Sequence, residues 1–214
     1  MKKKSTGLLF ITPFILFFML FWLIPFIYGI VMSLSKYSLI MGNQGFVGFS
    51  NYIKILVGDS MYHNSFLLGL KNTVIFTACT TPFLVLGSLG LALLLDRLPD
   101  KCKGIFRTIY FASYSVSVTA VAAVFVWLMK GNGGYLNNLM MNIGIIKKAV
   151  PWMEQQPFVW VSLTVATVWW TIGYNMMLFV NALNEIDPQL YEASAIDGAR
   201  YWKQFRYIIF PGIK

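Results

Sequence analysis

The stretch NTVIFTACTTPFLVLGSLGLALLL, residues 72–95, contains no Asp, Glu, Lys or Arg. Its 24 residues exceed the roughly 20 apolar residues that a helix needs to cross a bilayer. A helix pairs its own backbone amides and carbonyls, so it is stable in hydrocarbon, where no water can bind those groups. The stretch therefore predicts a membrane-spanning helix over about residues 73–95.

Three further charge-free runs repeat this pattern along the chain. They predict spanning helices over about residues 8–32, 108–129 and 158–182. Hydrophobic residues make up 57% of the chain and charged residues 12%, against roughly 25% charged in an average soluble domain. The expected fold is therefore all-α: a polytopic membrane helix bundle with four complete transmembrane helices and the start of a fifth.

Basic residues predict which side of the membrane each loop occupies. Ten of them lie in the N-terminal tail, in residues 96–107 and in the closing segment, and six are spread over the two longer loops. The first group, which begins with Lys2, Lys3 and Lys4, is expected in the cytoplasm. Three lysines before an apolar run also occur in signal peptides, but this run is longer than a signal's apolar region, so we expect it to be retained. Because the bases are scattered, no nucleic-acid partner is expected.

Few side chains are suited to catalysis or metal binding. The single histidine, His63, lies in a predicted outer loop without a metal-spaced cluster or a hydrolase motif, so we expect no metal, no cofactor and no enzymatic activity. The four predicted spans contain no acidic or basic residue. This argues against an ion-coupled secondary carrier, because such carriers place ionisable groups within the membrane.

The closing segment, YEASAIDGARYWKQFRYIIFPGIK from residue 191, is far more polar than the spans. Asp187 and Pro188, just before it, are typical of a helix start, and Gly198 is typical of a helix end. Between them, residues 193–195 are small and Glu192 is anionic. A helix of this kind suits close docking against another protein and equally suits an ordinary interfacial helix, so the physical pattern leaves both open.

The spacing of this segment resembles the cytoplasmic signature of permease subunits of bacterial ABC importers. That signature reads Glu-Ala-Ala, three residues, Gly, nine residues, then Ile-x-Leu-Pro. Here the spacing is held by Glu192-Ala193-Ser194, Gly198 and Ile208-Ile209-Phe210-Pro211, with Ser194 and Phe210 as the departures. The flanking run GYNMMLFVNALNEIDPQLYEASAIDGARYWKQF and the earlier FVGFSNYIKIL are similar to the sugar and glycerol-phosphate permease group, although Asp187-Pro188 stands where Ile-Pro is usual.

The resemblance implies a division of labour among several proteins. The chain would be a multi-pass permease of the bacterial cell (inner) membrane, surrounded by lipid and paired with a second permease subunit. A cytoplasmic dimer of ATP-binding subunits would hydrolyse ATP, and an extracellular or periplasmic solute-binding protein would deliver the substrate. A cytoplasmic coupling segment, about residues 185–206, would dock the ATPase. Its implied coupling residues are Glu192, Ala193, Ser194, Asp197, Gly198 and Pro211.

The substrate implied by the resemblance is a sugar, such as an oligosaccharide, with glycerol phosphate or another small solute as the alternative. In the fourth predicted span, Tyr174 and Asn175 are candidate pathway residues, because aromatic rings stack on sugars and amides bind hydroxyls; helix packing is the competing role. Six spans are usual in this group, with the signature between the fourth and the fifth. A chain that ends at Lys214 is therefore expected to be C-terminally truncated.

Overall fold

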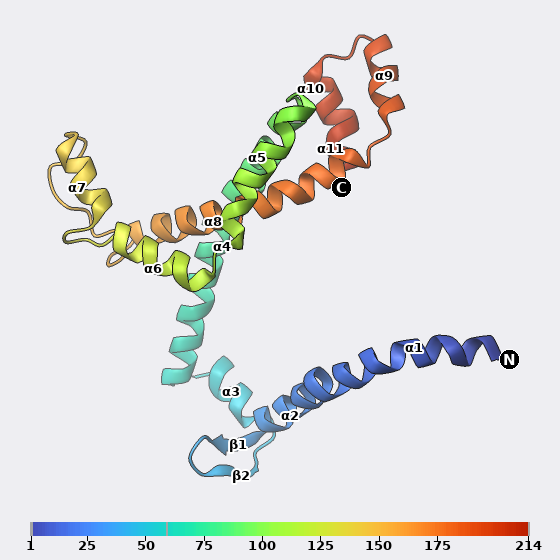
Figure 1. Ribbon diagram of the computed structural model, residues 1–214. Helices are drawn as coiled ribbons and strands as arrows, with labels where there is room; N and C mark the ends of the chain where they lie inside the picture. Colours follow the sequence, from blue (N-terminus) through green and yellow to red (C-terminus); the bar gives the residue numbers. More distant parts are fainter. Residues whose placement is uncertain (1, 59, 214) are drawn as a thin grey trace. The chain divides into compact units, whose positions relative to one another are not determined.

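The computed structural model describes residues 2–58 and 60–213, with side chains for residue 7 and from residue 10 onward within these ranges (Figure 1). The chain divides into two compact units, Met1–Lys71 and Asn72–Lys214. The side chains of Lys2, Lys3 and Lys4, with which the orientation prediction begins, lie outside the described set.

The first unit is built on one long apolar helix followed by a small hairpin. Residues Phe10–Ser33 are long and apolar enough to cross a membrane, in agreement with the span predicted over residues 8–32. The strands pair antiparallel and form a hairpin that the sequence did not indicate. In chain order the elements are α1 (Lys2–Phe18), the π-helical η1 (Met19–Leu23), α2 (Ile24–Ser33), β1 (Ser35–Ser38), β2 (Gly42–Phe46) and α3 (Ser50–Leu56).

The second unit is a helical bundle that contains most of α4. Two of its helices, α4 and α8, pass the length and apolarity test for a span. The elements are α4 (Met61–Asp96), α5 (Asp100–Ala112), the 3-10 turn η2 (Ser113–Ser115), α6 (Val118–Leu128), α7 (Tyr135–Asn142), α8 (Phe158–Asn184), α9 (Pro188–Ile196), α10 (Tyr201–Gln204), the π-helical η3 (Phe205–Ile209) and α11 (Phe210–Gly212). The all-α membrane bundle predicted from the sequence is confirmed.

The continuous helix predicted over residues 108–129 is not present as one piece. The segments on either side of the break, Asp100–Ser115 and Val118–Leu128, meet at 88°. At the break Val116 is extended, and the Ser117 hydroxyl accepts a hydrogen bond from the backbone amide of Ala120, which caps a new helix. The described chain thus has three helices suited to cross a membrane, or four if this bent pair forms one span.

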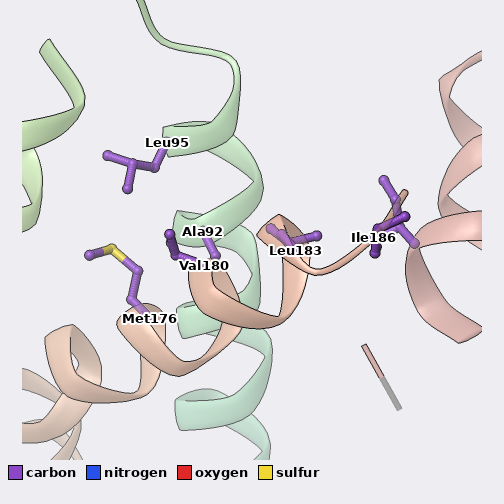
Figure 2. Packing of buried hydrophobic residues seen from close by; sticks show 7 residues of the cluster. Ala92, Leu95, Met176, Val180, Leu183 and Ile186 are labelled. Carbon is purple, nitrogen blue, oxygen red and sulfur yellow. The ribbon is translucent and has the colours of Figure 1, made fainter. Parts of the chain in front are cut away.

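The core of the second unit lies where α4 crosses α8 (Figure 2). Ala92 and Met176 are completely buried there, and Leu95 of α4 packs in the same cluster. The small Ala92 side chain lets the two helices approach, as small residues do in membrane bundles. Ile186 and Ile209, which flank α9 and α10, join this cluster. The closing segment is therefore packed against the bundle at both of its ends.

A second close crossing brings the end of α5 onto α8. Gly173 of α8 is buried, and a β-carbon at this position would overlap the backbone carbonyl of Tyr110. The Ser113 hydroxyl reinforces the contact, because it lies within hydrogen-bond distance of the carbonyls of Tyr110 (3.0 Å) and Trp170 (3.3 Å). Only glycine fits at this crossing, and the crossing lies beside the break between α5 and α6.

The long loop between α6 and α8 closes around one buried amide. The Asn137 side chain of α7 is 1% exposed, and its Nδ2 donates to the carbonyls of Gly131 (2.8 Å) and Val150 (2.9 Å). Its Oδ1 accepts from the Val150 amide (3.1 Å) and from Trp152 Nε1 (2.8 Å). A buried polar group must be paired to be tolerated, and here the amide connects both ends of the loop.

Candidate functional site

The helix predicted at the start of the closing segment is present, with the predicted ends. Asp187 caps it through a hydrogen bond from the Gln189 amide (2.9 Å), and Pro188 occupies the first turn. Gly198 has φ +67°, the left-handed conformation that side chains other than glycine adopt at a cost. The Ala199 amide then donates back to the Ser194 carbonyl (2.9 Å). α9 is thus a short helix with fixed ends, as the sequence predicted.

α9 is attached to the protein along one face. Tyr191 and Ser194 are half-buried, and the Ser194 hydroxyl donates to the Tyr191 carbonyl (2.8 Å). Gln204 Nε2 of α10 donates to the same hydroxyl (3.0 Å), and Figure 1 shows α9 running beside α10. Ser194, predicted as part of a small docking surface, is therefore directed toward α10 rather than outward.

The opposite face of α9 is exposed. Glu192, Ala193 and Asp197, three of the predicted coupling residues, lie on it, and Gly198 is exposed at its end. Ile196 is 87% exposed, so this face presents an apolar side chain beside the carboxylates. The remaining predicted residue, Pro211, is exposed on α11, which follows α9 in the chain after α10 and η3.

The end of α4 holds the closing segment from a second direction. The guanidinium of Arg97 lies over the Tyr201 ring at the start of α10, 3.8 Å from the ring centre. Burial raises the pKa of Tyr191, and the neighbouring charge on Asp96 and the Tyr201 phenol raise it further. Sequence reasoning did not pair these residues, because nothing in their spacing indicates that the end of α4 meets α9 and α10.

The predicted pathway residue Tyr174 belongs to an aromatic cluster at the break between α5 and α6. Its ring stacks on Tyr114 with centres 4.7 Å apart and planes at 20°, and Tyr114 also stacks on Trp170 at 5.8 Å. Tyr114 and Tyr174 are 38% and 40% exposed. Tyr114, which the sequence did not single out, lies at the centre of the cluster. Asn175 is directed elsewhere: its Nδ2 donates to the Thr171 carbonyl of its own helix (2.9 Å).

A cavity of about 460 Å³ lies next to this cluster. Its lining residues come from α5, from the turn that follows it and from α8: Arg107, Thr108, Phe111, Ala112, Ser115 and Met177. Phe111 also contacts the Tyr114 ring, with centres 5.9 Å apart. The cavity is mainly apolar, with one cation and two hydroxyl groups at its wall. Such a surface suits a solute that offers both apolar faces and polar groups.

These features define a multi-pass membrane protein with a short, half-exposed helix in its closing segment and an open, mainly apolar pocket beside an aromatic cluster. The family model described as "Binding-protein-dependent transport system inner membrane component" matches residues 50–214. The chain belongs to this family, whose members are components of transport systems. The predicted relationship to importer permeases is confirmed.

Curated relatives match almost the whole chain. The "Probable ABC transporter permease protein YurN" of Bacillus subtilis is 31% identical over 214 residues, which cover all of this chain and 71% of that protein. The "Lactose transport system permease protein LacF" of Rhizobium radiobacter is 31% identical over 97% of this chain and 67% of its own length.

A solved structure confirms the fold independently. It is the crystal structure of a bacterial ABC transporter involved in the import of the acidic polysaccharide alginate. One of its chains aligns with a TM-score of 0.81 over 99% of this chain and 69% of its own length, at 23% identity. Identity this low speaks for the fold alone.

Proposed function

We propose that this chain is the transmembrane permease subunit of an ATP-driven importer, that it forms part of the pathway for a sugar, and that it docks a cytoplasmic ATPase through α9. The observation that carries the proposal is the form of α9: it is capped at both ends, packed on one face, and exposes Glu192, Ala193 and Ile196 on the other. Membership in a binding-protein-dependent family supports the assignment.

A permease subunit that docks a separate ATPase requires further proteins as partners. A second permease subunit completes the pathway, a dimer of ATP-binding subunits supplies the hydrolysis, and a solute-binding protein outside the membrane delivers the substrate. In this arrangement α9, the loop after α4 and the N-terminus all lie in the cytoplasm. The excess of basic residues on that side supports the orientation.

Coupling in this proposal is mechanical. The ATPase subunits close on ATP and open after hydrolysis, and α9 moves with the cleft in which it is docked. The Ser194–Gln204 hydrogen bond ties α9 to α10, and Ile186 before α9 and Ile209 after α10 lie in the core cluster. A push on α9 is therefore passed to the bundle in this proposal. A ligand or partner shifts such an equilibrium only by binding the two states unequally.

The substrate class is proposed from the aromatic cluster and the relatives. A sugar ring presents apolar C–H faces that stack on aromatic rings, while its hydroxyls bind polar groups at the edge. The exposed portions of Tyr114 and Tyr174 offer such a surface beside the cavity, and one relative is named a lactose permease. Glycerol phosphate, the alternative, has no apolar ring to stack and depends on cationic groups instead.

Cross-linking tests the docking role directly. In the assembled importer, a Glu192→Cys variant carrying a short cross-linker is expected to capture an ABC ATPase subunit, identified by mass spectrometry. Asp100→Cys is the matched control, because the Asp100 side chain is 95% exposed on the same predicted side. Capture from position 100 alone would refute the docking role. So would labelling of the Glu192→Cys thiol by an impermeant reagent added outside the cell.

Uptake measurements test the substrate class. Tyr114→Leu removes an aromatic face and should raise the sugar concentration needed for half-maximal uptake, by an amount corresponding to about 0.5–1.5 kcal/mol. Tyr114→Phe keeps the stack and serves as the control. Transport of labelled glycerol phosphate, with no uptake of any of a panel of mono- and oligosaccharides, would exclude a sugar and favour the alternative.

A further inference from the structure

Arg107 of α5 lies in the wall between two cavities. One is the cavity of about 460 Å³ beside the aromatic cluster. The other is a small cavity of about 10 Å³, roughly the space that one water molecule needs. The small cavity is lined by the end of α4, by Arg107 and by the end of α8: Ala92, Leu95, Asp96, Arg107, Val180, Leu183 and Asn184. The guanidinium therefore adjoins both the proposed pathway and the end of α4.

In this arrangement Arg107 is incompletely paired. Its Nε is buried and has no hydrogen-bond partner among the described residues. Asp96 lines the same small cavity, yet within the described part of the chain no ion pair joins the two side chains. A buried donor without a partner is unfavourable, and a carboxylate across a space of one water is the group that would satisfy it.

Asp96 is the last residue of α4, where this helix approaches the closing segment. Its negative charge contributes, after burial, to the raised pKa of Tyr191 of α9. The next residue, Arg97, lies over the Tyr201 ring of α10. Through these contacts, a movement of α9 and α10 would displace the end of α4, and with it the position of Asp96 relative to Arg107.

We propose that Asp96 and Arg107 form an ion pair in one transport state and separate in the other, so that motion of the docking segment reaches the pathway through the end of α4. The proposal rests on the proposed function. The structure shows the separated state, in which Arg107 lines the larger cavity. In the paired state the guanidinium turns to Asp96 and the small cavity closes.

Such a pair contributes to coupling only because it differs between the two states. A coupling free energy of the usual size changes the affected equilibrium roughly 5- to 150-fold. Loss of the pair should therefore lower ATP-dependent uptake by a factor in this range. Docking of the ATPase on α9 should be unaffected, because neither side chain lies on the exposed face of that helix.

The test uses the complete importer in vesicles with ATP on the ATPase side. Asp96→Asn and Arg107→Gln should each lower uptake, whereas the exchanged pair Asp96→Arg/Arg107→Asp should restore a large part of it. Asp100→Asn is the matched control, since Asp100 pairs with Lys103 on the surface. Uptake by either single variant equal to that of Asp100→Asn, or an exchanged pair no better than the singles, would overturn the proposal.

A second measurement does not depend on transport. Cysteines introduced at positions 96 and 107 should form a disulfide with different yields in the presence and absence of a non-hydrolysable ATP analogue, and equal yields would contradict a state-dependent pair. Cross-linking from Glu192→Cys is measured in the same vesicles. If Glu192→Cys, with no other change in the protein, does not cross-link to the ATPase subunit, the docking function is refuted. If that cross-link forms and Asp96→Asn transports normally, only the ion pair is refuted.

Discussion

The Arg97 guanidinium lies over the Tyr201 ring, with its central carbon 3.8 Å from the ring centre. Arg97 directly follows α4 and Tyr201 begins α10, so the two residues are distant in sequence. A cation over an aromatic ring is attracted by the ring's negative face. This contact attaches the closing segment to a second helix, in addition to its covalent link with α8.

Removing the ring should loosen α10. Tyr201→Leu is expected to lose about 0.5–2 kcal/mol of the contact between α4 and α10, while Tyr201→Phe keeps most of it. The measurement is the rate of tryptic cleavage at Arg200 and Lys203 in the purified protein, which should rise for Leu and stay near the original rate for Phe. Equal rates for the two variants would show that the ring is not the attachment.

We expect the left-handed Gly198, which joins α9 to α10, to be needed for passing movement of α9 on to the rest of the protein. Gly198 has φ +67°, and a β-branched residue in this conformation costs roughly 1–2 kcal/mol. Gly198→Val is expected to uncouple ATP hydrolysis from uptake, whereas Gly198→Asn tolerates the conformation and should transport. Both rates are measured in the same vesicles. Normal substrate-stimulated transport by the Val variant would refute the role of this turn.

The crossing of α5 and α8 should be intolerant of one added methyl group. Gly173→Ala places a carbon against the Tyr110 carbonyl and should cost about 1–3 kcal/mol through overpacking. Gly104→Ala is the control on α5, because its β-carbon meets no atom within 4 Å. Thermal unfolding in detergent should show a lower midpoint for Gly173→Ala and no decrease for Gly104→Ala; equal midpoints would contradict the close crossing.

The Asn137 amide should be essential for local order in the loop between α6 and α8. Asn137→Ala leaves buried partners such as the Val150 amide and Trp152 Nε1 unsatisfied, at a cost of about 1–3 kcal/mol for each group. The neighbouring Asn138 is exposed, so Asn138→Ala is the matched control. Limited proteolysis between α6 and α8 should be faster for Asn137→Ala than for the unaltered protein, and unchanged for Asn138→Ala. Comparable protection of both variants would exclude the amide as the organising group.

The sequence by itself determined that this protein has membrane-spanning helices, and it determined where most of those helices lie. Absence of charge over more than 20 residues is a local property, and transfer into lipid depends on each residue's own polarity, so residues 8–32, 73–95 and 158–182 were predicted close to their observed helices. The ends of α9 were also predicted correctly, because helix ends depend on local signals. The Asp187 cap and the left-handed Gly198 depend on neighbours within a few residues.

Only the tertiary structure decided which distant side chains meet. Residues 108–129 carry no charge, and the break within them involves the cap at Ser117 and the approach of Gly173 to Tyr110. The partnerships of Tyr114 with Tyr174, and of Arg97 with Tyr201, join residues 60 and 104 positions apart. No local pattern encodes these pairs, because they depend on where helices cross, and the crossings are set by packing of side chains from several helices at once.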